Sequence, residues 1–343
     1  MPLDARKEVL LRLVVEDYIL TVEPVASLRL VEKFDLGICA ATVRHEMAVL
    51  EELGFLRQPH PSAGRIPTDK GYRYYVDNLE QTEGLALREK QDIQNLYSLS
   101  ARGMEELMRE TSDLLSRLTS YIAVIFTPPL KKSVLKRLDL ISLSPQTVLL
   151  VLITDTGLVE KKIIQFESFL EPEVLQEVER VLNRKFVNLS LEEISRGLSE
   201  LNFVSVQERA LAERIFGETD GYITEEEKER LFWGGTTNIL DQPEFGSSAK
   251  IQSLLEVLEG GYSLLGLLRD ALDQESVVVK IGSEIEPAKL EGCSFVASSY
   301  KVNGEIFGAL GLLGPTRMNY PKAISAVECI AQNLGVILES FHP

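Results

Sequence analysis

The 343-residue sequence predicts a multidomain α+β protein with roughly two or three domains. Three observations support this fold class. Helix-spaced apolar residues and a short basic hairpin fill residues 1–80, strand patterns occupy 121–166 and 277–313, and a helix-rich segment separates the two strand groups. With 45% hydrophobic and 26% charged residues, the composition is typical of folded domains rather than of a disordered chain.

The N-terminal region predicts three helices. Amphipathic patterns cover Asp4–Leu20 and Ser27–Phe34, and a turn follows at 35–37. A third helix begins near Ala41 and ends at Gly54, because a glycine suits a helix C-cap. Its apolar stripe consists of Val43, Met47, Leu50 and Leu53. This helix is therefore expected to bury one face and to leave the opposite face exposed.

The face opposite this stripe is typical of a helix that contacts DNA bases. Ala41 and Ala48 are small enough to let the helix lie close to base edges, and an alanine can contact a thymine methyl group. Arg44 offers the paired bonds that guanine accepts, and His45 is a second candidate for a base contact. Thr42, near the helix N-terminus, suits a phosphate. Taken alone, the pattern also fits a surface helix with solvated charges.

A basic hairpin follows this helix. Leu56–Gln58 and Arg65–Ile66 are predicted strands around a loop marked by proline and glycine. From Arg57 to Tyr75 the net charge is +3, in a chain of net charge −16, and phosphate binding needs such a local surplus. This order of elements predicts a winged helix-turn-helix DNA-binding domain over residues 1–80. The candidate DNA-binding residues are Ala41, Thr42, Arg44, His45, Ala48, Arg57, His60, Ser62, Gly64, Arg65, Lys70 and Arg73.

Charge and symmetry refine this hypothesis. Lys70 is expected on a phosphate, and Arg65 in the groove beside the wing. Residues 1–80 carry a net charge of −3, and the remaining 263 residues, the body of the protein, carry −13. A DNA duplex is therefore expected to repel the body and to attract the basic hairpin region. We therefore expect few phosphate contacts per subunit and strong salt dependence. Because one small domain reads few base pairs, a homodimer on an inverted repeat of double-stranded DNA is expected.

The rest of the chain predicts a connector, a sheet and an insertion. A helical connector covers 81–102, and an amphipathic helix from Met104 to Leu118 is expected to pack on its own domain's sheet, with a subunit contact as the alternative. Strands are predicted at Tyr121–Phe126, Val134–Ser142, Thr147–Ile153, Val159–Phe166, Val277–Ile281, Ser294–Tyr300 and Glu305–Leu313. Helices are predicted at Glu173–Phe186, Leu191–Leu201, Gln207–Phe216 and Ile324–Phe341. This order predicts one antiparallel sheet, formed by 103–168 and 223–343, around an inserted segment at 169–222.

The sequence of the body gives little support to the hypothesis that the protein is an enzyme. The histidines are His45, His60 and His342, two in the DNA module and one at the tail, which argues against a histidine-based triad or metal cluster. The glycines of GALGLLG at 308–314 lack dinucleotide-loop spacing and are interpreted as strand glycines. We therefore expect no catalytic residue, metal or cofactor. A small-molecule pocket in the body is the alternative that stays open.

The sequence also predicts a cytoplasmic protein. Cys39, Cys293 and Cys329 are scattered and odd in number, which argues against disulfides and zinc and for a reducing compartment. No apolar run approaches about 18 residues, so no membrane span is expected. The first residues lack the basic region of a signal peptide.

The sequence resembles the HrcA family of bacterial heat-inducible transcription repressors. The resemblance rests on ATVRHEM at 41–47, LEELG at 50–54, QPHPSAGRIPTDKGYRYYVD at 58–77, LFWGGTTNIL at 231–240 and GPTRMNY at 314–320. Two positions depart from the family's pattern. Cys39 stands where serine is common, which weakens an N-cap. His45 stands where asparagine is usual, which changes a side chain expected to contact DNA.

The resemblance implies a GAF-like domain split by an inserted dimerising segment. It also implies a dimer on an inverted-repeat operator upstream of chaperone operons, supported by the chaperonin GroEL and released on heat stress. Arg317 is interpreted as a structural residue before the last helix and a candidate domain-interface contact. Two alternatives remain. One is a metabolite-sensing regulator, which ligand stabilisation would favour, and the other is an enzyme with an accessory winged helix, which needs a polar pocket of convergent titratable groups.

Overall fold

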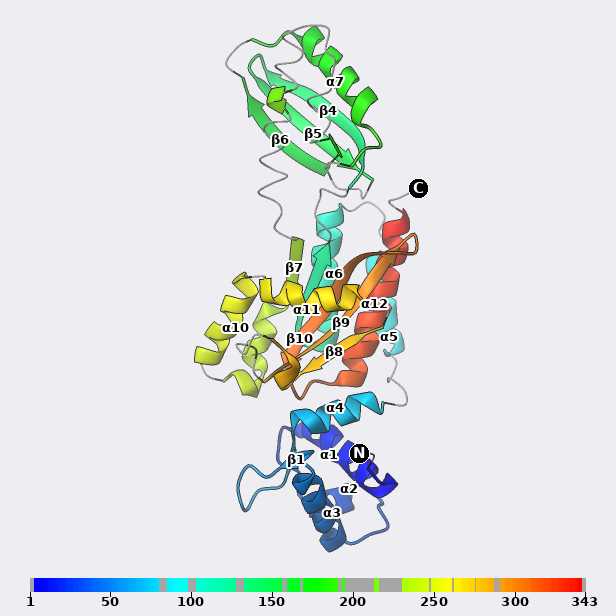
Figure 1. The fold of residues 1–343 in the computed structure, drawn as a ribbon, viewed down its shortest axis with the longest axis vertical. Coiled ribbons are helices and arrows are strands. Elements are labelled where there is room, and N and C mark those ends of the chain that lie inside the picture. The colour runs from blue at the N-terminus through cyan, green and yellow to red at the C-terminus, as the bar shows by residue number, and fades with distance from the viewer. Residues whose placement is uncertain are drawn as a thin grey trace.

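The structure is a computed structural model with three parts along its long axis (Figure 1). It describes residues 3–79, 85–97, 103–127, 133–155, 159–166, 169–190, 193–194, 213–215, 230–246, 248–260, 262–274, 276–286, 290 and 292–340. The expected mixed α+β class with antiparallel sheets is confirmed. Within the described residues, no helix is both long and apolar enough to cross a bilayer.

The N-terminal part contains helices and one hairpin. Its elements are α1 (Ala5–Thr21), α2 (Ser27–Lys33), α3 (Ala40–Glu52), β1 (Leu56–Arg57), β2 (Ile66–Pro67) and α4 (Asp69–Asp77). Asp4 caps α1 by accepting from the Lys7 N–H at 3.0 Å, and Thr68 caps α4 by accepting from the Gly71 N–H at 3.2 Å. Gly54 has a φ of +79° just after α3, the left-handed conformation that ends many helices. The core between these helices includes Leu10, Val14, Leu30, Val43, Met47 and Leu50.

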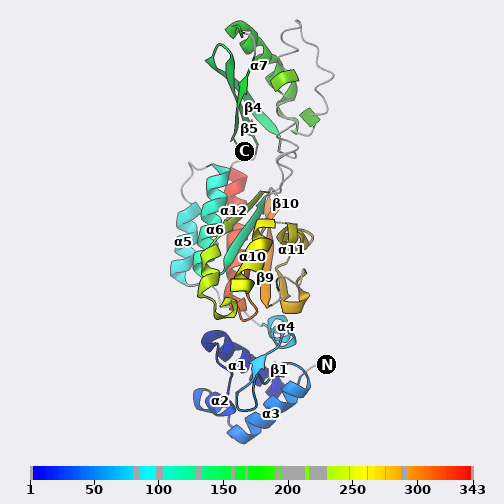
Figure 2. The same ribbon diagram turned by 90° about the vertical axis from the view of Figure 1, so that its left-hand side faces the viewer.

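The middle part is a five-stranded antiparallel sheet with helices on both faces (Figure 2). Its strands, in spatial order, are β7 (Arg230–Gly234), β3 (Ile122–Thr127), β10 (Glu305–Pro315), β9 (Cys293–Val302) and β8 (Val278–Ile281). One face is covered by α5 (Leu87–Tyr97), α6 (Met104–Thr119) and α12 (Tyr320–Ser340), and the other by α10 (Ser248–Gly260) and α11 (Tyr262–Leu272). The helix expected from Met104 therefore packs on the sheet of its own part. The predicted connector includes α5, which packs on α12 and buries Ile93.

The third part corrects the predicted single sheet. β4 (Leu135–Ser144), β5 (Thr147–Thr154) and β6 (Val159–Gln165) pair in sequence order as a separate sheet, with α7 (Pro172–Phe186) packed against it. The prediction that they share a sheet with the C-terminal strands is wrong, because they form a sheet of their own. Hydrophobic patterns predict strands but not their partners. The helix predicted at Glu173–Phe186 is confirmed, whereas those at 191–201 and 207–216 fall largely outside the described residues.

Candidate nucleic-acid interface

α3 lies at the end of the molecule opposite the three-stranded sheet, and its predicted outer face is accessible (Figure 1). Ala41, Arg44 and His45 are exposed, and Thr42 and Ala48 beside them are half-buried. The opposite face is buried at Val43, Met47 and Leu50. In the described part of the chain, no ion pair engages Arg44. The helix therefore presents small side chains and an arginine on one protruding surface.

Both ends of α3 affect this surface. The Cys39 side chain makes no cap bond to the backbone, as the sequence analysis expected of a thiol. Its sulfur lies 3.3 Å from the Thr42 hydroxyl, and this hydrogen bond lowers the pKa of the thiol. The first N–H groups of α3 thus lack a side-chain cap and are available to an anion. At the other end Leu53, predicted in the buried stripe, is 39% exposed because the helix ends there.

The hairpin loop is closed by its own hydrogen bonds. β1 pairs antiparallel with β2, which begins one residue later than predicted. Gln58 Nε2 donates to the carbonyls of Pro61 at 3.1 Å and Ala63 at 2.8 Å. The hairpin side chains exposed to solvent include Arg57 of β1 and His60 and Ser62 of the loop. These three candidates therefore stand on the surface, next to α3.

Gly64 and Arg65 hold the hairpin against the protein. A Cβ at Gly64 would lie 2.3 Å from the Val25 carbonyl oxygen, so a larger residue does not fit without a backbone shift. The Arg65 N–H donates to the Val25 carbonyl, and the Val25 N–H donates to the Arg65 carbonyl, both at 2.9 Å. The Arg65 side chain is 13% exposed, and its Nε donates to the Glu51 carboxylate at 2.9 Å. Arg65 is therefore paired with α3 in this structure, and its contact with a DNA groove stays a prediction.

Lys70 is also engaged inside the N-terminal part. Its Nζ donates to the Leu53 carbonyl at the end of α3, at 2.8 Å, and lies 4.5 Å from the centre of the Phe55 ring. A cation at a helix C-terminus satisfies a carbonyl and the helix dipole. Lys70 thus completes the end of α3, and its expected phosphate contact stays a prediction.

Arg73 faces the middle part, and its predicted contact with DNA stays a prediction. Its Nη2 donates to the Val279 carbonyl at 2.6 Å, and its guanidinium pairs with Glu284 of η5 (Gly282–Glu284). Hydrogen bonding to Glu284 raises the pKa of Arg73. Of the four cations that produce the +3 surplus, Arg57 is the one whose side chain makes neither an ion pair nor a hydrogen bond within the described residues.

Further contacts of α4 join the N-terminal part to the sheet. Asp69 accepts from the Ser283 N–H at 2.9 Å. The Tyr72 ring is buried with its centre 6.0 Å from that of Tyr320, at the start of α12. Burial raises the pKa of Tyr72 well above its ordinary value. α4 therefore serves as the docking helix between the two parts.

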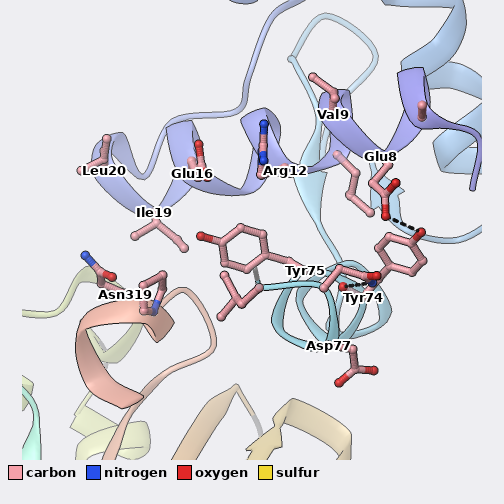
Figure 3. Close-up of a pocket in the computed structure, with 15 residues that line it drawn as sticks. Glu8, Val9, Arg12, Glu16, Ile19, Leu20, Tyr74, Tyr75, Asp77 and Asn319 are labelled. Atoms are coloured by element: carbon pink, nitrogen blue, oxygen red, sulfur yellow. Dashed lines mark hydrogen bonds between the residues drawn. The ribbon is translucent and has the colours of Figure 1, made fainter. Parts of the chain in front are cut away.

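A groove lies on the other side of this junction, between α1, α4 and the start of α12 (Figure 3). It has a volume of about 1040 Å³, and its lining includes Arg12, Ile19, Tyr75 and Pro321. The Tyr74 hydroxyl donates to Glu8 at 3.1 Å along one wall. The junction is thus packed beside β8 and open beside α1.

An ion cluster that was not predicted from the sequence joins α1 to α2. Asp17 is fully buried, with Arg29 Nε at 2.9 Å and Lys33 Nζ at 2.8 Å from its carboxylate oxygens. The signal was present, because Asp17 continues the helix-spaced apolar stripe of Leu10 and Val14. A carboxylate in such a stripe needs a cationic partner. The cluster fixes α2 on α1 and so supports α3.

Arg317 has a structural role in the middle part. Its guanidinium pairs with Glu244 of η4 (Pro243–Phe245), and its Nη2 donates to Gln242 Oε1 at 2.7 Å. The side chain is 13% exposed. These contacts join the turn before α12 to the segment after β7. Arg317 therefore bridges to a neighbouring acid within the middle part, which agrees with the structural role predicted for it.

The arrangement is that of a transcription regulator: an exposed helix face at one end, carried by a larger body. No group of three or more histidine, cysteine or acidic side chains suited to a metal occurs in the described ranges. The protein-family model described as the HrcA protein C-terminal domain matches residues 105–324 of this chain. The chain belongs to the HrcA family of heat-inducible transcription repressors.

Three relatives and one solved structure illustrate the match. The heat-inducible transcription repressor HrcA of Pelotomaculum thermopropionicum is 37% identical over 99% of this chain and 98% of its own length. Those of Desulforudis audaxviator and Moorella thermoacetica are 39% and 37% identical, each over 100% of both chains. A crystal structure described as that of a hypothetical protein is 26% identical, with a TM-score of 0.69 over 99% of this chain and 100% of that chain.

Proposed function

We propose that this repressor binds an inverted-repeat operator as a homodimer, with α3 as the base-contacting helix of a winged helix-turn-helix domain. The observation that carries the proposal is the protruding face of α3, where Arg44 and His45 are exposed beside the small residues Ala41 and Ala48. Thr42, at the uncapped N-terminus of α3, is proposed to contact a phosphate. Arg57, His60 and Ser62 of the hairpin complete the surface.

The proposed domains follow the three parts of the fold. The winged helix-turn-helix domain comprises α1 to α4, and a GAF-like domain comprises α5, α6, β3 and the chain from β7 to α12. The inserted domain comprises the chain from β4 to the segment before β7. Gly64, Arg65 and Lys70 are assigned to holding the winged helix-turn-helix domain together, and Arg73 is assigned to joining it to the GAF-like domain.

The outer face of the inserted sheet is the proposed dimer surface. Ile141, Leu149 and Ile163 stand side by side on neighbouring strands. Ile141 is 47% and Ile163 is 61% exposed, and α7 packs on the opposite face. Adjacent exposed apolar residues mark a surface that a partner covers. A two-fold axis would bring two copies of the same face together, which is how most homodimers form.

A lysine on this face should separate the subunits. We expect Ile163→Lys to raise the dimer dissociation constant by about 100-fold or more, because the charge would be buried without a partner. Sedimentation of the full chain across a concentration series measures the change. Leu20→Lys, at a 71% exposed position on α1, is the control and should leave the dimer intact. Equal behaviour of the two variants would assign dimerisation to another surface.

Operator binding is tested by selection. The full-length protein is incubated with a random-sequence duplex library at low salt, and the bound duplexes are sequenced and compared with footprints on chaperone promoters. An inverted repeat with half-sites about one helical turn apart, or a multiple of that distance, supports the proposal. Duplexes without symmetry, or no selection at all, would refute it.

Arg44 should contribute directly to base recognition. We expect Arg44→Ala to weaken binding to the selected duplex by about 10- to 100-fold, since one bidentate contact to guanine is worth about 1–3 kcal/mol. Fluorescence anisotropy with labelled duplex measures this. Arg12→Ala removes an exposed arginine that lines the groove beside α1, away from α3, and should have little effect. Unchanged affinity of Arg44→Ala would exclude this arginine from the interface.

Heat release and chaperonin support are proposed on family grounds. A repressor whose competent form depends on GroEL would lose operator binding when unfolded proteins occupy the chaperonin. The proposed setting is the cytoplasm, and no catalytic activity is proposed.

A further inference from the structure

The hairpin loop contains no lysine or arginine between Gln58 and Gly64. His60 and Ser62 supply its exposed polar side chains. Long-range attraction to phosphates therefore does little to place this loop on DNA. Its contribution depends on how accurately the protein holds it relative to α3.

Glu51 connects α3 to both ends of the loop. Its Oε1 accepts from the Gln58 N–H at 3.2 Å, just after β1, and its Oε2 accepts from Arg65 Nε at 2.9 Å, just before β2. The same residue lies about two helical turns beyond Arg44 on α3. One carboxylate thus links the base-contacting helix to the two ends of the hairpin loop.

The hairpin has a second anchor on the segment between α1 and α2. There the backbones of Val25 and Arg65 exchange two hydrogen bonds of 2.9 Å, and Gly64 packs on Val25 with no space for a Cβ. The hairpin is thus held by Val25 on the α1–α2 segment and by Glu51 on α3. Loss of the Glu51 link would leave a single anchor.

We propose that Glu51 is a positioning residue for operator recognition, which fixes the orientation of the hairpin relative to the exposed face of α3. The inference rests on the proposed operator binding. Charge alone predicts the opposite effect of Glu51, because a carboxylate near a duplex is repelled and its removal should strengthen binding to any DNA. The sign of the change on the operator therefore separates positioning from simple electrostatics.

Glu52 provides a matched control. It is the next residue on α3, it is exposed, and it forms no hydrogen bond or ion pair within the part of the chain that the structure describes. Glu51→Gln and Glu52→Gln make the same change of charge near the same helix end. Only the first replaces one of the two oxygens that link α3 to the hairpin by an NH2 group, which cannot accept the bond from Gln58 or Arg65.

The experiment compares full-length wild type, Glu51→Gln and Glu52→Gln on two duplexes of equal length. One is the duplex that the wild type selects from a random library, and the other is its scrambled sequence. We expect Glu51→Gln to lose about 10-fold in affinity for the selected duplex, as loss of a charge-assisted hydrogen bond predicts, with no loss on the scrambled duplex. Glu52→Gln should keep the wild-type ratio of the two affinities.

A wild-type ratio in Glu51→Gln would overturn the inference while leaving operator binding intact. Failure of the wild type to select any sequence would instead overturn the proposed function. If thermal unfolding shows that Glu51→Gln is not folded at the assay temperature, Arg65→Lys carries the test. It keeps the charge of Arg65 but removes the Nε donor, and should lower the affinity ratio in the same direction.

Discussion

Replacing Asp17 by asparagine is expected to lower the free energy of unfolding of the N-terminal part by roughly 3 kcal/mol. The carboxylate is fully buried and contacts Arg29 and Lys33 at 2.9 and 2.8 Å. An amide of similar shape keeps the volume but leaves two cations facing a neutral group. Because Arg29 and Lys33 side chains are 35% and 42% exposed, they regain some hydration, which keeps the loss near the lower end for a buried ion cluster.

Amide exchange of α1 to α3 is the suitable measurement for this variant. The single tryptophan, Trp233, lies in β7 of the middle part, so its fluorescence follows a different region. Asp35→Asn, at an exposed position after α2, is the matched control and should change stability by less than about 0.5 kcal/mol. Similar protection in the two variants would show that the cluster does not stabilise the N-terminal part.

Gly64→Ala is expected to destabilise the hairpin by roughly 3 kcal/mol and to reduce operator affinity with it. The added Cβ would meet Val25 carbonyl oxygen at 2.3 Å and the Pro24 carbonyl carbon at 2.7 Å, and backbone atoms cannot rotate away. The hairpin would have to leave Val25, which also strains the Arg65 contact with Glu51. Amide exchange at Val25 and Arg65, together with anisotropy on the selected duplex, measures both effects.

Gly266→Ala is the control for the Gly64→Ala substitution, and its expected effect on stability has the opposite sign. Gly266 lies within α11, and nothing occupies the space that its Cβ would fill. Alanine in an open helical position should therefore stabilise the protein by up to about 1 kcal/mol. A loss at Gly266 equal to that at Gly64 would mean that close packing on Val25 is not the cause.

The face of α3 could be predicted from sequence because helical spacing is local. Val43, Met47 and Leu50 define the buried side, and the positions between them must then face outward. The turn at Asn303–Gly304 could be predicted for the same reason. Both residues have the positive φ that such hairpin turns require. In each case a few neighbouring residues determine the conformation.

The partners of charged residues could not be predicted, because they come from distant parts of the chain. A count of +3 treats each cation as unpaired, yet Arg65 pairs with Glu51, 14 residues away, and Arg73 with Glu284, 211 residues away. The division into two sheets has the same origin. β3 and β5 are both strongly apolar in sequence, but β3 is buried on both faces whereas β5 is buried at alternate residues. That difference depends on the helices that pack against each strand.

The apolar face of β4–β6 and the exposed face of α3 lie at opposite ends of the long axis of the subunit (Figure 1). A small rotation at one end therefore produces a large displacement at the other. If two copies join at the far end, a slight tilt there sweeps each α3 through a wide arc. Thermal loosening of the contact between the two β4–β6 faces would then move the two α3 helices out of register with the half-sites, without unfolding either N-terminal part.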